Sequence, residues 1–191
     1  MALNKKMKLA TVSAVALGVA SLAADAQAQS AKLTANATVT VDNSFDLTET
    51  TIMNFGTVVA ICDTAANSAT LTISPAGALG TVPAGAAKFI VVNSANATQG
   101  VFDVANAAPS TALNVSYANT AALACTAGCS GNQPSLALSA ITDDTTAGVT
   151  TTSNAGALTF NVGGTLTTTA SCANQYEDGV YKGTFDVTVA Y

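Results

Sequence analysis

Apolar and polar residues alternate most clearly in the segment 181–191. Every second residue is apolar or aromatic, with glycine at position 183, and the residues between them are mostly polar. A period of two predicts a β-strand with one buried face. Chain ends fray unless other elements hold them, so this pattern predicts a strand that is firmly paired. The expected buried face carries Tyr181, Gly183, Phe185, Val187, Val189 and Tyr191.

The segment 32–42 shows the same alternation near the other end of the chain. Its apolar positions are small in the middle and larger at both ends, as in a strand that fits a groove of uneven depth. Two topologies are open: the strand pairs within its own sandwich, or a neighbouring copy receives it. The apolar face is Leu33, Ala35, Ala37, Val39 and Val41.

Shorter apolar runs recur between these two segments and are separated by turn residues. Met53, Phe55, Val59 and Ile61 predict one odd-numbered buried face, with Gly56 at a bulge. The run 89–92 is continuously apolar, which predicts a central strand buried on both faces. Further alternations are Leu113, Val115 and Tyr117, and then Leu136, Leu138 and Ala140. Strands at short intervals without a long helical period predict an antiparallel β-sandwich rather than a parallel α/β fold.

The first residues have the three parts of a secretory signal. Lys5, Lys6 and Lys8 precede an apolar run over 9–24, and an Ala-Gln-Ala site follows at 26–28. We therefore expect residues 1–28 to be cleaved after export through the Sec pathway. The remaining chain would comprise the strand segment 29–42 and a single sandwich domain, 43–191. We expect no membrane span, because no later apolar stretch is long enough.

The charge pattern argues against nucleic acid as a partner. After cleavage three lysines and ten acidic residues remain, a net charge of −7. A chain with so few cations cannot neutralise phosphates along a nucleic acid.

Four cysteines in an exported chain predict disulfides rather than free thiols. Three pairings are open. The short loop from Cys125 to Cys129 contains a glycine and suits a local bridge, which leaves Cys62 to pair with Cys172. A metal site is disfavoured because the chain has no histidine and only one close cysteine pair.

Catalytic groups are scarce. The chain has no histidine, arginine or tryptophan, and its carboxylates form no recognisable catalytic motif. We therefore expect neither enzymatic activity nor a cofactor. Asp143 and Asp144 are candidate Ca²⁺ ligands, but they lack EF-hand spacing and fit a solvated turn better.

The segment from residue 162 to 191 resembles the C-terminal signature of a family of small bacterial secreted β-sandwich domains without assigned function. It begins Val-Gly-Gly-Thr-Leu at 162–166, and the motif Met-Asn-Phe-Gly-Thr-Val at 53–58 matches the same family near its other end. That family is similar in turn to the spore coat protein U type and other pilins of the chaperone-usher pathway.

This resemblance implies an immunoglobulin-like, pilin-type sandwich that lacks one strand and receives it from a neighbouring pilin subunit. It also implies a periplasmic chaperone, an outer-membrane usher and a place in a surface fimbria that supports adhesion or biofilm. A chaperone would bind the C-terminal strand through Phe185, Val187, Val189 and Tyr191. The alternative is a self-contained secreted or periplasmic binding module, and a secreted hydrolase of unfamiliar type is a third class.

Overall fold

The computed structural model describes residues 32–41, 44–117, 120–145 and 148–191. The expected signal peptide, 1–28, lies outside the described residues, as do 29–31 and 42 of the expected N-terminal strand segment. The chain divides into two units, Met1–Thr40 and Val41–Tyr191. In the first unit, residues 32–40 have no assigned secondary structure, and the second unit contains all of the strands.

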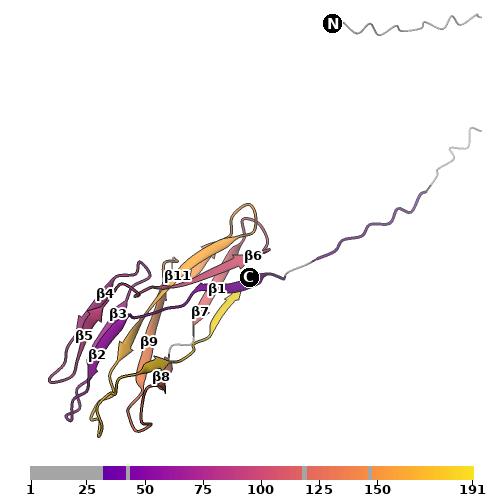
Figure 1. The fold of residues 1–191 in the computed structure, drawn as a ribbon. Helices are drawn as coiled ribbons and strands as arrows, with labels where there is room; N and C mark the ends of the chain where they lie inside the picture. Colours follow the sequence, from indigo (N-terminus) through magenta and orange to yellow (C-terminus); the bar gives the residue numbers. More distant parts are fainter. Residues whose placement is uncertain (1–31, 42–43, 118–119, 146–147) are drawn as a thin grey trace, which may run out of the picture. The chain divides into compact units, whose positions relative to one another are not determined.

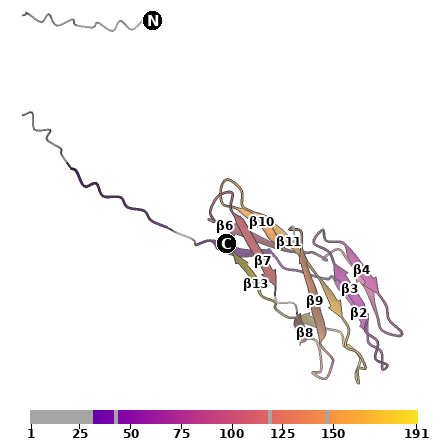
Figure 2. The ribbon, with the colours of Figure 1, turned by 180° about the vertical axis from the view of Figure 1, so that it is seen from behind.

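The second unit contains one large sheet and two small ones, all with antiparallel pairing (Figures 1 and 2). The large sheet has β11 (Leu158–Thr167) at its centre. One edge of β11 pairs with β9 (Leu136–Asp143), and the other is shared by β6 (Gly100–Ala105) and β3 (Thr70–Ile73). The sheet is completed by β1 (Asp46–Thr51), β4 (Leu79–Val82), β8 (Thr120–Ala127) and β12 (Val180–Lys182).

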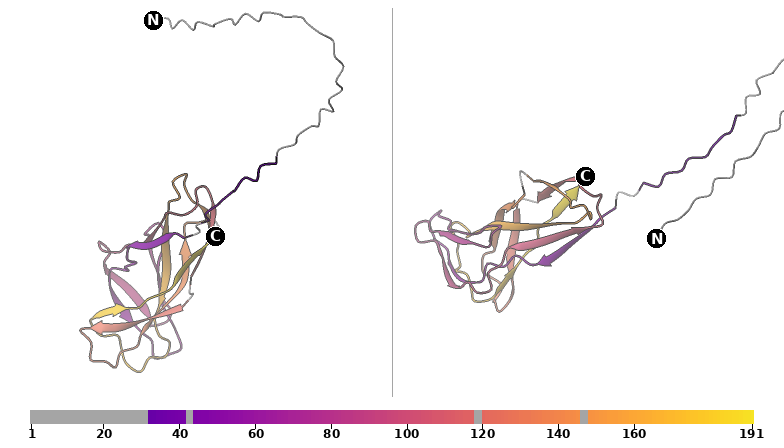
Figure 3. Two further views of the ribbon diagram at one scale, coloured as in Figure 1. Left: turned by 90° about the vertical axis from the view of Figure 1, so that its right-hand side faces the viewer. Right: turned by 90° about the horizontal axis from the view of Figure 1, so that it is seen from above.

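The two small sheets supply the opposite layer. One has the order β10 (Val149–Thr151), β7 (Ala112–Tyr117), β13 (Val187–Ala190), and the other pairs β2 (Thr57–Ile61) with β5 (Lys88–Asn93). Further views show strands throughout the unit and no helix among the described residues (Figure 3). Within the same residues, no helix is long and apolar enough to cross a membrane.

One hydrophobic core joins the layers. Phe160 and Val162 of β11 are fully buried, as are Leu71 of β3 and Leu113 of β7. Phe102 stacks on Phe160 with ring centroids 5.5 Å apart, and Phe89 of β5 reaches the same cluster. Many of the apolar residues that alternate along the sequence form this core. The predicted all-β, immunoglobulin-like antiparallel sandwich is confirmed.

Two local irregularities reverse faces that the sequence predicts to be continuous. The first lies where Gly56, with φ +78°, precedes β2, and the ladder that follows has a bulge whose extra residue is Val92 of β5. Phe55 is buried as expected, but after Gly56 it is Val58 and Ala60 that pack on the core, and Val59 is 45% exposed. The odd-numbered face through Val59 is therefore wrong, because the left-handed backbone at Gly56 breaks the alternation between Phe55 and Val58.

The second bulge lies in β9. Leu136 and Leu138 are buried as predicted, but Ala140 has a φ of +48° and is exposed. The register with β11 shifts here, and Ile141 takes the next buried position. The prediction for Ala140 is therefore wrong, because a bulge adds one residue to the strand and moves later side chains to the other face.

The prediction of a central strand buried on both faces at 89–92 is also wrong. Phe89 is buried, whereas Ile90 and Val92 are 46% and 63% exposed. Among the described strands β5 pairs only with β2, and nothing packs over the outer face of this two-stranded sheet. A continuous apolar run reports strand propensity, but burial of its second face depends on another layer.

The C-terminal segment forms two strands instead of one. β12 pairs with β8 in the large sheet, residues 183–186 leave the ladder, and β13 pairs with β7 in the opposite layer. The predicted alternation of faces holds for Tyr181, Phe185, Val187 and Val189, which pack on the core, whereas Gly183 and Tyr191 of the same predicted face are exposed. The single strand over 181–191 is wrong because the chain crosses from one sheet to the other at this point.

Two disulfides form with the pairing expected from loop length. Cys62 joins Cys172 across a sequence separation of 110, and Cys125 joins Cys129 across a separation of 4. The first bridge is buried, with its cysteines 2% and 7% exposed, and the second is only half-buried.

Candidate functional site

A cavity of about 1220 Å³ opens between β2 and the C-terminal segment. We call it the β2–β12 groove. One wall is residues 52–60, and the other is residues 176–185. Its floor is apolar and comes from the large sheet: Phe102, Leu123, Leu136, Leu138 and Leu166.

The first wall presents a strand edge. β2 is hydrogen-bonded to β5 along one side only, and among the described strands it has no ladder partner on the other. Met53, Phe55 and Val58 pack toward the core from this wall, while Ile52 is 73% exposed. An unpaired edge beside an apolar surface is the arrangement that accepts an added strand.

The second wall presents unpaired backbone as well. Residues 183–186 belong to no ladder in the described structure, and β13 beyond them pairs with β7 alone. Phe185 points inward from this stretch and meets Phe102 edge-on, with ring centroids 6.4 Å apart. A strand placed in the groove would find backbone groups on both sides and aromatic rings below it.

Hydrogen bonds fix residues 177–180 of this wall to β8 and to the loop that follows it. The carboxylate of Glu177 accepts hydrogen bonds from the Ser130 amide and hydroxyl, both at 2.6 Å. The hydroxyl of Ser130, followed by its amide, lowers the pKa of Glu177 below the ordinary value. Thr126 donates its hydroxyl to the carbonyl of Val180 at 3.1 Å, and the Tyr181 hydroxyl donates to the carbonyl of Glu177 at 3.2 Å.

The C-terminus is held against the first strand of the sandwich. Tyr191 packs edge-on against Phe45 with ring centroids 5.5 Å apart, and its hydroxyl accepts a hydrogen bond from the Ala108 amide at 2.9 Å. Figure 1 shows the C-terminus beside β1. Of the four residues expected to contact a chaperone, Phe185, Val187 and Val189 are partly buried, and Tyr191 is 42% exposed.

The predicted donor residues lie in a segment without strand structure. Leu33 and Val39 are 90% and 86% exposed, and Val41 is 73% exposed. Ala35 and Ala37 are exposed as well. This is an unusual condition for a segment with alternating apolar side chains, because such side chains normally pack against another surface.

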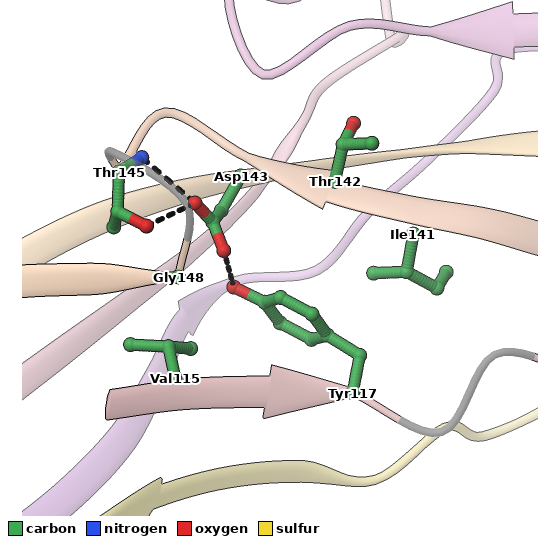
Figure 4. A pocket seen from close by; sticks show the side chains of 7 residues that line it. All are labelled: Val115, Tyr117, Ile141, Thr142, Asp143, Thr145 and Gly148. Carbon is green, nitrogen blue, oxygen red and sulfur yellow. Dashed lines mark hydrogen bonds between the residues drawn. The ribbon is translucent and has the colours of Figure 1, made fainter.

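A second, smaller cavity of about 350 Å³ lies between β7 and the end of β9 (Figure 4). The Tyr117 hydroxyl donates a hydrogen bond to Asp143 at 2.7 Å, and the amide of Thr145 donates to the same carboxylate at 2.7 Å. Burial of the phenol, followed by the hydrogen bond and the nearby charges of Asp143 and Asp144, raises the pKa of Tyr117. The contact joins the two layers of the sandwich, and this arrangement indicates a structural role.

Asp143 and Asp144 do not face one another as paired metal ligands. Asp143 binds Tyr117 and Thr145, whereas Asp144 accepts hydrogen bonds from the Asn161 amide at 2.9 Å and side chain at 2.6 Å. In the described ranges, no three metal-binding side chains gather into a possible cation site.

The sequence predicts only part of the groove. The alternation of apolar residues indicates Phe185 and the apolar residues of 53–58, but it does not indicate that β8, Tyr176 and Glu177 line the groove as well. The Asp178-Gly179 pair, which predicts a turn before the last strands, is the available sequence signal for this end of the groove. Which strands would leave an edge unpaired depends on the pairing of residues far apart in the chain.

Comparisons with known proteins gave one match. Residues 45–191 match a family model described as a domain of unknown function, DUF4402. Searches among curated proteins and among solved structures found no match to the chain.

Proposed function

The chain belongs to the DUF4402 family of domains of unknown function, and from this premise and the open groove we propose that it is a structural subunit of a surface filament. Each subunit would accept, in its β2–β12 groove, the segment 33–41 of a neighbouring copy. The observation that carries the proposal is the apolar groove with unpaired backbone on both walls.

The shape of the groove suits a strand better than a small ligand. Its walls, 52–60 and 176–185, are about as long as the segment 33–41, and an added strand could form ladders with both. Beside β2 and the unpaired residues 183–185, the added strand would extend the β5-β2 sheet toward the chain that leads into β13. Alternation fits as well, because one face of the segment is apolar and would meet the floor while its threonines and Asn36 face water.

The energetics favour a long-lived complex between the groove of one subunit and the segment 33–41 of the next. Burial of Leu33, Val39 and Val41 is worth about 1.5–3 kcal/mol for each side chain, and ladder hydrogen bonds add to this. Part of the gain offsets the ordering of a segment that has no structure of its own. Slow dissociation is the expected result of such a buried strand.

The proposed symmetry leads to a filament. Donation from one copy to the next is a head-to-tail operation that need not close into a ring. A subunit whose groove is empty exposes apolar surface, so we propose that a periplasmic chaperone occupies the groove beside Phe185, Val187, Val189 and Tyr191 before an outer-membrane usher directs assembly. Export through the Sec pathway, periplasmic passage and a final position at the cell surface, in adhesion or biofilm, complete this proposal.

Electrophoresis of material sheared from the native cells tests the proposal. We expect a ladder of multimers in unheated SDS samples that collapses to a single band after boiling. Val39→Asp should abolish the ladder because it places a charge on the apolar face of the donor segment. Thr38→Asp is the matched control, since it adds the same charge to the opposite face and should leave the ladder intact.

A single monomer band for the unheated wild-type protein would contradict the proposal. If the protein is then also a stable monomer that refolds alone, it is a self-contained secreted or periplasmic binding module.

A further inference from the structure

The half-buried disulfide Cys125–Cys129 touches the turn before β12, which belongs to the groove wall 176–185. The pairing places Val180 opposite Ala127 and Tyr181 opposite Cys125. The turn that leads into β12 therefore sits directly against the ring closed by this disulfide.

Gly179 shows how tight this contact is. A Cβ atom on Gly179 would lie 2.7 Å from the Cys125 sulfur and 2.6 Å from the Ala127 carbonyl oxygen, and it would also collide with the Cys129 sulfur. From the other side, a Cβ atom on Gly128 would lie 3.2 Å from the backbone of both Asp178 and Gly179. The two loops thus interlock through glycines, and the disulfide fixes the shape of one of them.

The polar contacts of the wall depend on the same ring. Ser130, which donates twice to Glu177, directly follows Cys129, and Thr126, which donates to Val180, lies within the ring. Opening the disulfide would free both residues from their fixed positions. Three attachments of the wall would therefore loosen together.

The two disulfides differ in their accessibility to a reductant. Cys62 and Cys172 are buried, while Cys125 and Cys129 are both half-buried. Attack on a disulfide requires access to one of its sulfur atoms. A dithiol reductant should therefore open Cys125–Cys129 first and leave Cys62–Cys172 intact.

We propose that Cys125–Cys129 is a redox-sensitive clasp that pre-forms the β2–β12 groove for strand binding. In the oxidised protein the wall 176–185 is held in place, and an incoming strand does not have to order it. In the reduced protein the wall is mobile and binding is weaker, because ordering it opposes binding. This inference rests on the proposed function of the groove as a strand acceptor.

The chemistry of the clasp is ordinary thiol–disulfide exchange. A thiolate of the dithiol reductant attacks one of the two sulfurs, the sulfur–sulfur bond breaks, and the departing cysteine takes up a proton. The second thiol of the reductant resolves the mixed disulfide, and the other cysteine is released and protonated. The protein gains two electrons and two protons, and the reductant becomes a disulfide.

The test uses the full chain with Ala37→Asp and Val39→Asp, which prevent its own segment from acting as a donor. A labelled peptide with the sequence of residues 32–42 is titrated into the oxidised protein and into protein whose Cys125–Cys129 has been reduced and alkylated, as verified by mass mapping. We expect the affinity to fall about tenfold on reduction, and amide hydrogen exchange in 179–185 to accelerate. The double variant Cys125→Ser with Cys129→Ser should reproduce both effects without a reductant.

Each outcome decides one of the two proposals. Equal peptide affinity and equal hydrogen exchange before and after verified reduction would overturn the clasp while leaving the acceptor groove intact. Failure of the oxidised protein to bind the peptide would instead refute the strand-acceptor function. The clasp would then be judged on hydrogen exchange alone, and unchanged exchange in 179–185 would overturn it.

Discussion

Gly183 lies so close to Ala122 that a Cβ atom on Gly183 would stand 2.5 Å from the carbonyl oxygen of Ala122. This contact lies where the C-terminal segment leaves the large sheet and begins its crossing toward β13. The lack of a side chain at Gly183 therefore allows the wall of the groove to lie directly on β8.

Gly183→Ala should move this wall outward, because backbone atoms cannot yield as the end of a flexible side chain can. We expect a loss of about 1–3 kcal/mol in the free energy of unfolding, together with weaker binding of the 32–42 peptide. Gly80→Ala in β4 is the matched control, since a Cβ atom there meets no heavy atom within 4 Å. Denaturant unfolding of both variants provides the measurement, and equal stability of the two would contradict the account of the wall.

Tyr117→Phe should destabilise the sandwich by about 1–2 kcal/mol, since it removes the hydrogen bond to the carboxylate of Asp143. The raised pKa of Tyr117 also predicts a pH dependence. The proton is held more tightly in the folded state, so the contribution is complete below the ordinary tyrosine value of about 10 and is lost as the pH rises above it. Unfolding measured from pH 8 to 11 should show a smaller alkaline loss for Tyr117→Phe than for the wild type.

The wall should respond to acid through Glu177. Its pKa is lowered by the hydroxyl and amide of Ser130, so the stabilisation that it provides is present above the ordinary glutamate value. It is lost as the pH falls through the lower value of the folded state. Hydrogen exchange in 176–180, corrected for its intrinsic pH dependence, should therefore accelerate in acid. Glu177→Gln should remove this acid-dependent step, and a step of unchanged size in that variant would assign it to another group.

The two disulfides should differ strongly in their effect on stability. The bridge Cys62–Cys172 closes a loop with a sequence separation of 110, for which chain entropy predicts about 4–5 kcal/mol. Cys125–Cys129 closes a loop with a separation of 4, for which the same relation gives about 2 kcal/mol. Serine replacement of each pair, followed by thermal or denaturant unfolding, measures the difference. Equal losses would show that the short bridge does more than constrain the unfolded chain.

Local alternation predicted the strands whose partners are regular. Leu113 and Val115 are buried as expected, and the C-terminal residues Phe185, Val187 and Val189 face the core. Alternation does not hold at Gly56, whose left-handed backbone precedes β2, or at Ala140, where one extra residue in β9 changes the face of the residues that follow. A bulge depends on the register with a distant strand, and no local pattern records that register.

The groove was predictable only in part for a related reason. The apolar faces of the sequence predict some of the lining residues. The crossing at residues 183–186 and the single-sided pairing of β2 arise from tertiary topology. The apolar runs that contain Val59 and Ile90 do not reveal whether a second layer covers these side chains.

Photo-crosslinking between differently labelled copies tests the central proposal most directly. A photo-reactive amino acid replaces Ala37, on the apolar face of the donor segment, or Thr38, on the polar face, in full chains with ¹⁵N label. These chains are assembled with unlabelled chains and irradiated, and the crosslinked peptides are identified by mass spectrometry. We predict crosslinks from position 37 of one copy to residues 52–60 or 176–185 of another, and few such crosslinks from position 38. Crosslinks from position 37 found only within single chains, or none to either wall, would contradict strand donation between subunits.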